Sequence, residues 1–181
     1  MNNVGTDKRS SLLKKIKDSS FLEGSFTTRA GEKTNYYIDK YRFETKPELL
    51  DSICNELLPL FPDPHTYDRI AAPELGAVPL AAVLSIKLMK PFIIVKKSSK
   101  EYGTQNLIEG LFKDGESVVL LEDILTSGGT AIKSCDVLLK HHLKIVHTVA
   151  VIDREEGAQE NMKKQGYTYD ALYTKSDLFN C

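Results

Sequence analysis

The sequence has little of three features that would place it in a special class: excess charge, paired cysteines and long apolar runs. With 24 basic and 25 acidic residues its formal net charge is −1, so the overall charge favours neither nucleic acid nor a membrane surface as a partner. Cys54, Cys135 and Cys181 lack metal-ligand spacing, which is typical of a reducing compartment. The N-terminal region has no long apolar stretch, so we expect no signal peptide and no membrane span. These absences predict a cytoplasmic protein that binds neither nucleic acid nor membrane.

The most informative stretch is SVVLLEDILTSGGTAIK, at residues 117–133. Its apolar run at residues 118–121 is typical of a strand buried on both faces of a parallel sheet. Glu122 and Asp123 follow at once, and residues 126–130 then form a loop of hydroxyl side chains and glycines ahead of a helix. Glycines let the backbone approach an anion, and both the loop N–H groups and the helix dipole favour negative charge. The stretch therefore predicts a phosphate site.

The acidic pair limits the kind of phosphate compound. Carboxylates repel a bare polyphosphate, but they accept hydrogen bonds well from the vicinal hydroxyls of a ribose. We therefore expect a ribose 5-phosphate, with its hydroxyls on Glu122 and Asp123 and its phosphate on residues 126–130. The alternative is an ordinary strand–loop–helix turn capped by Thr130. A Walker A loop is excluded, because no Gly-Lys-Ser/Thr follows the glycines.

The rest of the chain alternates between predicted strands and helices. Strands are expected at residues 68–72, 92–95, 145–152 and 169–173, and helices at about residues 47–58, 78–88 and 155–164. This alternation predicts an α/β fold, a parallel sheet flanked by helices. Ligands bind such sheets beyond the carboxyl ends of the strands, which gathers residues 73–76, 96–97, 122–130 and 153–154. We expect a single domain over residues 1–181, with an N-terminal helix and hood at about 1–43 and the α/β core at about 44–181.

Ahead of that core, residues 24–43 predict a hairpin that forms a hood and not a strand of the main sheet. The hairpin carries side chains that suit a flat, anionic ligand: Arg29, Lys33, Tyr36 and Tyr37. A surface hairpin with its tyrosines packed beneath it is the alternative interpretation.

A second loop, between residues 95 and 117, has about twenty residues without a convincing helix, which is typical of lids and binding loops. It carries Lys96, Lys97 and Lys100, followed by Tyr102. A lysine brought to a departing diphosphate stabilises the transition state more than the ground state. The alternative is a disordered loop whose lysines prevent aggregation.

Four stretches of the sequence resemble motifs of a known enzyme family. LLEDILTSGGTAI resembles the phosphoribosyl-diphosphate (PRPP) signature of type I phosphoribosyltransferases. KKSSKEYG is similar to the mobile catalytic loop of orotate phosphoribosyltransferases, FTTRAGEKTNYYI to their N-terminal segment, and IDREEGA to the stretch after their last core strand. The resemblance extends over about residues 26–158. It implies the type I phosphoribosyltransferase fold and the transfer of ribose 5-phosphate from PRPP to orotate.

The resemblance also implies roles for individual residues. The expected PRPP-binding residues are Glu74, Leu75, Lys96, Lys97, Lys100, Tyr102, Glu122, Asp123, Ile124, Leu125, Thr126, Ser127, Gly128, Gly129 and Thr130. The expected orotate-binding residues are Arg29, Tyr37, Thr126 and Arg154. Lys100 and Asp123 are the expected catalytic residues, acting on the leaving diphosphate and on the positive charge of the ribose. Mg²⁺ is expected as cofactor, held mainly by substrate and water and not by direct protein ligands. A homodimer would share loop 96–110 across its interface.

This chain departs from the family pattern at four positions. Lys96 and Tyr102 stand where an arginine and a histidine are common, and Leu75 and Arg29 stand where lysines are common. With Leu75, the backbone amides of residues 74–76 would have to hold the diphosphate together with Mg²⁺. Two rivals remain: a phosphoribosyltransferase for another base, such as a purine or uracil, and a PRPP-sensing regulator of the same fold. A neutral base would not need Arg154, and the retained lysine loop argues against a regulator.

Overall fold

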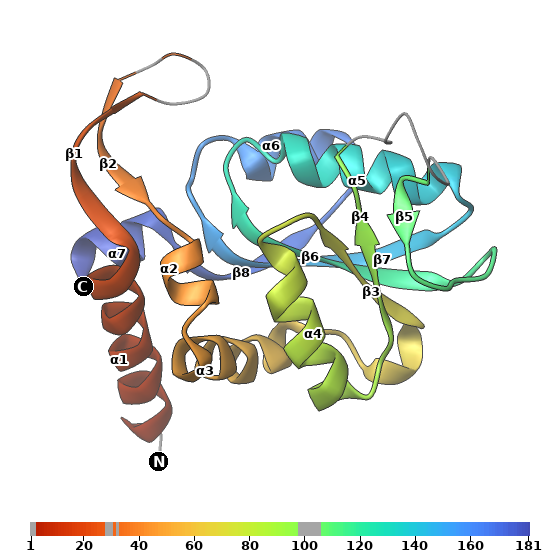
Figure 1. The fold of residues 1–181 in the computed structure, drawn as a ribbon, viewed down its shortest axis with the longest axis horizontal. Helices are drawn as coiled ribbons and strands as arrows, with labels where there is room; N and C mark the ends of the chain where they lie inside the picture. Colours follow the sequence, from red (N-terminus) through yellow and green to blue (C-terminus); the bar gives the residue numbers. More distant parts are fainter. Residues whose placement is uncertain (1–2, 28–30, 32, 98–105) are drawn as a thin grey trace.

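The computed structural model describes residues 3–27, 31, 33–97 and 106–181. Within these ranges the centre of the protein is a six-stranded sheet in the order β5-β4-β3-β6-β7-β8 (Figure 1). Its strands are β3 (Arg69–Pro73), β4 (Phe92–Val95), β5 (Ile108–Glu109), β6 (Ser117–Leu125), β7 (Lys144–Asp153) and β8 (Tyr169–Thr174). Every neighbouring pair is parallel except β5, which runs antiparallel to β4. The expected parallel α/β sheet is confirmed, and the loop between residues 95 and 117, predicted to have no convincing helix, contains the short strand β5.

Helices cover both faces of this sheet (Figure 1). One face carries α3 (Pro47–Leu57) and α4 (Ala77–Leu88), and the other carries α5 (Gly129–Lys140) and α6 (Ala158–Lys164). The buried side chains of β6 alternate between the two cores, as the twofold period of a strand requires: Val119 and Leu121 pack with α3 and α4, Val118 and Leu120 with α5 and α6. This alternation decides where the acidic residues further along β6 point.

The N-terminal part forms the expected hood. Helix α1 (Asn3–Ser20) leads into an antiparallel hairpin of β1 (Phe21–Thr27) and β2 (Lys33–Ile38), which stands outside the main sheet (Figure 1). The one-turn helix α2 (Tyr41–Glu44) then joins the hairpin to α3. The C-terminal helix α7 (Lys175–Asn180) packs against α1. The sequence pattern did not indicate this helix.

Strand β6 is longer than its apolar run. It continues through Glu122 and Asp123 to Leu125, four residues beyond the predicted end at residue 121, because its pairing with β7 extends from Ser117 to Leu125. Both acidic residues therefore belong to the strand and not to the loop. In the portion of the chain that the structure describes, none of the helices has the length and apolarity needed to cross a membrane.

Candidate active site

The carboxyl ends of the central strands meet where the sequence predicted a ligand crevice. Leu125 at the end of β6 pairs with Asp153 at the end of β7, and the backbone N–H of Arg154 donates to the carbonyl of Leu125 at 2.8 Å. On the other side, the N–H of Glu74 donates to the carbonyl of Val95 at 2.9 Å. The turn after β3, the loop after β6 and the stretch after β7 therefore lie along one edge of the sheet.

The loop after β6 ends in an open helix N-terminus. Gly128 is the N-cap of α5, with φ at 77°, a region that favours glycine, and a Cβ there would lie 3.1 Å from Met162 Cγ of α6. No side chain caps this end of α5 within the described residues, and its first turn carries no acidic residue. The backbone N–H groups of the first turn are thus available to an anion, as predicted for the phosphate of the ligand.

The two acidic residues of β6 point to opposite faces of the sheet. By the alternation of the strand, Glu122 faces the α5 side and Asp123 faces the α4 side. Glu122 is 3% exposed, its Oε1 has no hydrogen-bond partner among the described residues, and burial together with the charge of Asp123 raises its pKa to about 8. Glu122 is therefore protonated at neutral pH.

Asp123 has a partner that the sequence did not indicate. Its Oδ1 accepts the N–H of Ile124 at 2.5 Å, and its Oδ2 accepts a hydrogen bond from Lys40, which lies between the hairpin and α2. Lys40 is 83 residues away along the chain, so no local motif links the two. The hood thus supplies a cation to the predicted ribose site.

The turn after β3 and the start of the lysine loop are held together. The backbone N–H of Lys97 donates to Glu74 Oε1 at 2.8 Å, while Lys96 pairs with Glu109 at 2.7 Å. Leu75 is 61% exposed. A cleft of about 180 Å³ lies next to this turn; it is lined by Pro73, Val95, Lys96, Lys97, Thr130, Lys133, Ser134 and Val137. The structure therefore brings Lys96, Lys97 and Thr130 to one cleft, to which α5 adds the lysine at position 133.

Arg154, at the end of β7, is oriented by the hairpin. Its Nη2 contacts Glu156 at 2.7 Å and Tyr36 Oη at 3.3 Å, and its guanidinium lies 5.5 Å from the centroid of the Tyr36 ring. Its Nε–H is buried and has no partner among the described residues. Tyr37 packs on Phe26 at 5.6 Å and is 48% exposed, and its expected role in orotate binding stays a prediction. The tyrosine against Arg154 is therefore Tyr36.

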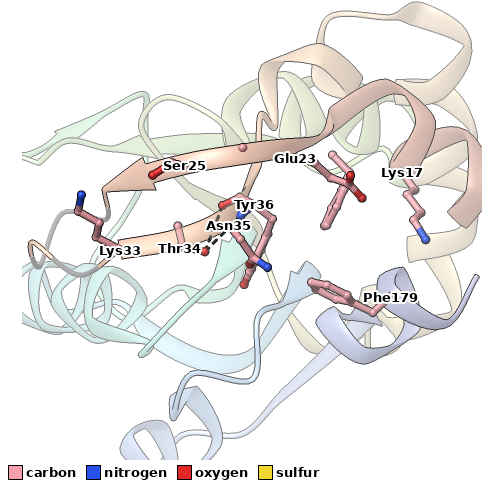
Figure 2. A pocket seen from close by; sticks show the side chains of 10 residues that line it. Lys17, Glu23, Ser25, Lys33, Thr34, Asn35, Tyr36 and Phe179 are labelled. Atoms are coloured by element: carbon pink, nitrogen blue, oxygen red, sulfur yellow. Dashed lines mark hydrogen bonds between the residues drawn. The ribbon is translucent and has the colours of Figure 1, made fainter.

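Tyr36 is fixed by an aromatic cluster on its other side. Its ring stacks on Phe21 at 5.5 Å and meets Phe179 of α7 edge-on at 5.2 Å. These rings line a cleft of about 1030 Å³ between the hairpin, α1 and α7 (Figure 2). Among the described residues, none of the predicted PRPP-binding residues lines this cleft, and its aromatic rings hold Tyr36 in place.

Three predicted site residues, Lys100, Tyr102 and Arg29, lie outside the described residues. Their expected roles stay predictions. Thr126 is half-buried at the start of the loop, next to Leu125 and therefore close to Arg154 along the sheet edge.

A family model and a similar protein of known family both indicate the same family for this chain. The family model "Phosphoribosyl transferase domain" matches residues 54–170, more than half of the chain. The orotate phosphoribosyltransferase of Pyrococcus abyssi is 42% identical over 173 residues, which cover 93% of this chain and 93% of that protein.

Two solved structures have the same fold. The orotate phosphoribosyltransferase of Aeropyrum pernix matches with a TM-score of 0.80 at 25% identity, over 95% of this chain and 97% of that one. The UMP synthase of Leishmania donovani matches with a TM-score of 0.82 at 28% identity, over 94% of this chain but only 37% of that longer one. By sequence and by fold, this chain belongs to the orotate phosphoribosyltransferases of the phosphoribosyltransferase family.

Proposed function

We propose that this protein transfers ribose 5-phosphate from PRPP to orotate, which forms orotidine 5′-phosphate and diphosphate in pyrimidine synthesis. The family supports this reaction. The observation that carries the choice of base is Arg154, whose buried Nε–H has no partner among the described residues, at the edge of the sheet beside the phosphate loop. A buried, unpaired donor on a guanidinium is suited to a carboxylate, which it can bind through two parallel hydrogen bonds.

The donor PRPP would lie along the edge of the sheet. Its 5′-phosphate fits the loop of residues 126–130 and the open N-terminus of α5, where N–H groups and helix dipole favour an anion. Its ribose hydroxyls would bind Asp123 and Glu122, the protonated Glu122 serving as either donor or acceptor. Its diphosphate would lie against the turn at residues 74–76, within reach of Lys96 and Lys97.

Catalysis then consists mainly of positioning and of stabilising charges that separate. Orotate is an anion with a nucleophilic ring nitrogen, so it needs no strong general base. As the bond at C1′ breaks, positive charge develops on the ribose, and the ionised Asp123 stabilises it. We propose that lysines of loop 96–110 stabilise the diphosphate, and that this loop is shared between the subunits of a homodimer.

Mg²⁺ is proposed as the cofactor, because it neutralises the charge of the diphosphate. The donor set fits this ion, which prefers oxygen and keeps several waters: the carboxyl groups of Glu122 and Asp123 are both buried, and Glu122 has an oxygen without a protein partner in the described ranges. Both carboxyl groups could accept hydrogen bonds from water bound to the ion, which would be held mainly by substrate and water.

Replacing Lys100 with alanine should lower kcat about a hundredfold with little change in the affinity for PRPP, because the contact acts on the charge that develops in the transition state. Steady-state kinetics together with calorimetric titration of PRPP measures both quantities. A variant with wild-type kcat would remove Lys100 from the mechanism.

The choice of base is tested by comparing acceptors. With PRPP and Mg²⁺, the absorbance of orotate should fall on turnover, whereas uracil and hypoxanthine, which lack the carboxylate that Arg154 binds, should react at least about a thousandfold less efficiently. A preference for either neutral base would contradict the proposal and favour a phosphoribosyltransferase for another base.

A further inference from the structure

We propose that Lys40 and Glu44 of the hood are positioning residues, which hold the Asp123 carboxylate in the orientation that the ribose of PRPP requires. This inference rests on the proposed function, since it takes Asp123 as the group that binds the ribose. It gives the segment between the hairpin and α3 a task in donor binding that its sequence does not suggest.

The contact between Lys40 and Asp123 is partly shielded from water. The Lys40 side chain is 28% exposed and the Asp123 side chain 7%, so their interaction is less screened than that of a surface pair. Asp123 uses one oxygen for Lys40 and the other for the N–H of Ile124. A carboxylate has about four acceptor positions, so two are still available to ribose hydroxyls while the group is held from both sides.

Gly76 lets this pair lie against the start of α4. A Cβ at this position would overlap with Asp123 Oδ2 and would lie 2.8 Å from Lys40 Nζ. Its φ of −65° is open to any residue, so the requirement for glycine here is one of space. Because residues 74–76 form the turn proposed for the diphosphate, the Lys40 ammonium lies beside both the ribose carboxylate and the diphosphate site.

Glu44 is the third member of a cluster that it forms with Lys40 and Asp123. It is 1% exposed, and neither of its oxygens has a hydrogen-bond partner in the part of the chain that the structure describes. The charged groups that act on it are Asp123 from β6, and Lys40 and Asp39 from its own segment. Burial first, and then the charge of Asp123, raise its pKa to about 8. At neutral pH it is therefore protonated, with an O–H that can be donated toward Asp123.

Protonated Glu44 keeps the charges of the cluster in balance. With Lys40 positive, Asp123 negative and Glu44 neutral, the cluster has no net charge when anionic PRPP arrives. An ionised Glu44 would repel Asp123, compete for Lys40 and oppose the binding of PRPP. We therefore expect the ionisation of Glu44 to lower kcat/KM for PRPP about tenfold per pH unit above about pH 8, in addition to the loss that the ionisation of Glu122, with its pKa also raised to about 8, causes at the ribose site.

The test compares matched variants from pH 6 to pH 10. Glu44→Gln keeps an N–H donor but cannot ionise, and Lys40→Met keeps much of the side-chain length without charge. Glu48→Gln and Lys46→Met change the same residue types at exposed positions next to the cluster and serve as controls. Orotate is kept saturating, and each kcat/KM for PRPP is plotted relative to that variant's value at pH 7.

In Glu44→Gln the alkaline fall should be shallower than in wild type, because only Glu122, whose pKa is also raised to about 8, is left to ionise at the ribose site, while both controls should follow the wild-type profile. Lys40→Met should lower kcat/KM for PRPP about thirtyfold at pH 7, mostly through a higher KM for PRPP. An alkaline fall in Glu44→Gln as steep as that of wild type, or a Lys40→Met variant within twofold of wild type, would overturn the proposal.

A second readout does not need turnover. The folded protein holds the Glu44 proton up to about pH 8, whereas the unfolded chain releases it near pH 4.5, so the stability that Glu44 contributes at low pH is lost as the pH rises through 8. A glutamine at position 44 has no such proton to release, so its contribution to stability does not change over this range. The Tm of Glu44→Gln should therefore rise relative to wild type between pH 5 and pH 9, and a constant difference would contradict a buried, protonated Glu44.

Failure of the proposed function would look different. It would appear as a wild-type protein that binds PRPP but does not consume orotate at any pH. The same variants would then be compared by the calorimetric Kd for PRPP, which should show the same dependence on pH and on Lys40 if the cluster holds Asp123, and none if it does not.

Discussion

Replacing Arg154 with alanine should lower kcat/KM for orotate about a thousandfold while KM for PRPP stays within about threefold of wild type. The guanidinium is largely buried, with its side chain 19% exposed, and its unpaired Nε–H is the donor proposed for the orotate carboxylate. Removing one partner of a buried, hydrogen-bonded charge pair typically costs about 4 kcal/mol, which corresponds to about three powers of ten. Initial rates with either substrate varied at a saturating level of the other separate the two constants.

The control for this variant is Arg42→Ala, which removes an exposed arginine of α2 and should leave both constants unchanged. A loss of PRPP binding equal to the loss of orotate binding would mean that Arg154 supports the sheet edge and does not recognise the base. Retained activity on orotate would remove it from the site altogether.

Replacing Gly76 with alanine should lower kcat/KM for PRPP about three hundredfold. The added Cβ cannot coexist with Asp123 Oδ2 in its present place, so the carboxylate must move and its contact with Lys40 must break. A displacement of about 1 Å in a positioned group costs about a hundredfold in rate, and the disturbed cation adds to this loss. The backbone conformation itself is unaffected, since its φ is −65°.

Thermal unfolding of Gly76→Ala, followed by circular dichroism, distinguishes a misplaced carboxylate from a lost fold. Gly24→Ala, on the exposed part of β1, is the matched glycine control and should keep wild-type kinetics. If Gly76→Ala melts normally and retains wild-type kcat/KM for PRPP, the close approach of Asp123 to the start of α4 has no role in donor binding.

The sequence was sufficient to predict the sheet and the strand–loop–helix turn that we propose as the phosphate site. Both depend on short-range patterns: buried runs such as residues 92–95 and 118–121, and glycines at a strand–helix junction such as Gly128. The alternation of strands with helices then leaves few possible topologies, which is why the parallel arrangement of the strands could be predicted.

Features that depend on contacts between segments distant in the sequence could not be predicted in this way. The polar pair Glu122 and Asp123 interrupts an apolar run, so a pattern based on hydrophobicity ends the strand early, although its pairing with β7 continues. The contact between Lys40 and Asp123 joins segments that only the packed hood brings together.

The sequence did contain a signal for which of the two adjacent tyrosines, Tyr36 or Tyr37, points inward. Ile38 is buried, and side chains two residues apart in a strand share a face, so Tyr36 and not Tyr37 should point inward. Applied to the hairpin, that rule indicates the tyrosine that the structure places against Arg154.

The most direct test of the account is a crystal structure of this protein with PRPP and Mg²⁺. The account predicts the 5′-phosphate on the N–H groups of residues 126–130 and the ribose hydroxyls within hydrogen-bond distance of Asp123, with Lys40 still beside that carboxylate. A ribose bound elsewhere, or an Asp123 carboxylate without contact to the sugar, would contradict it.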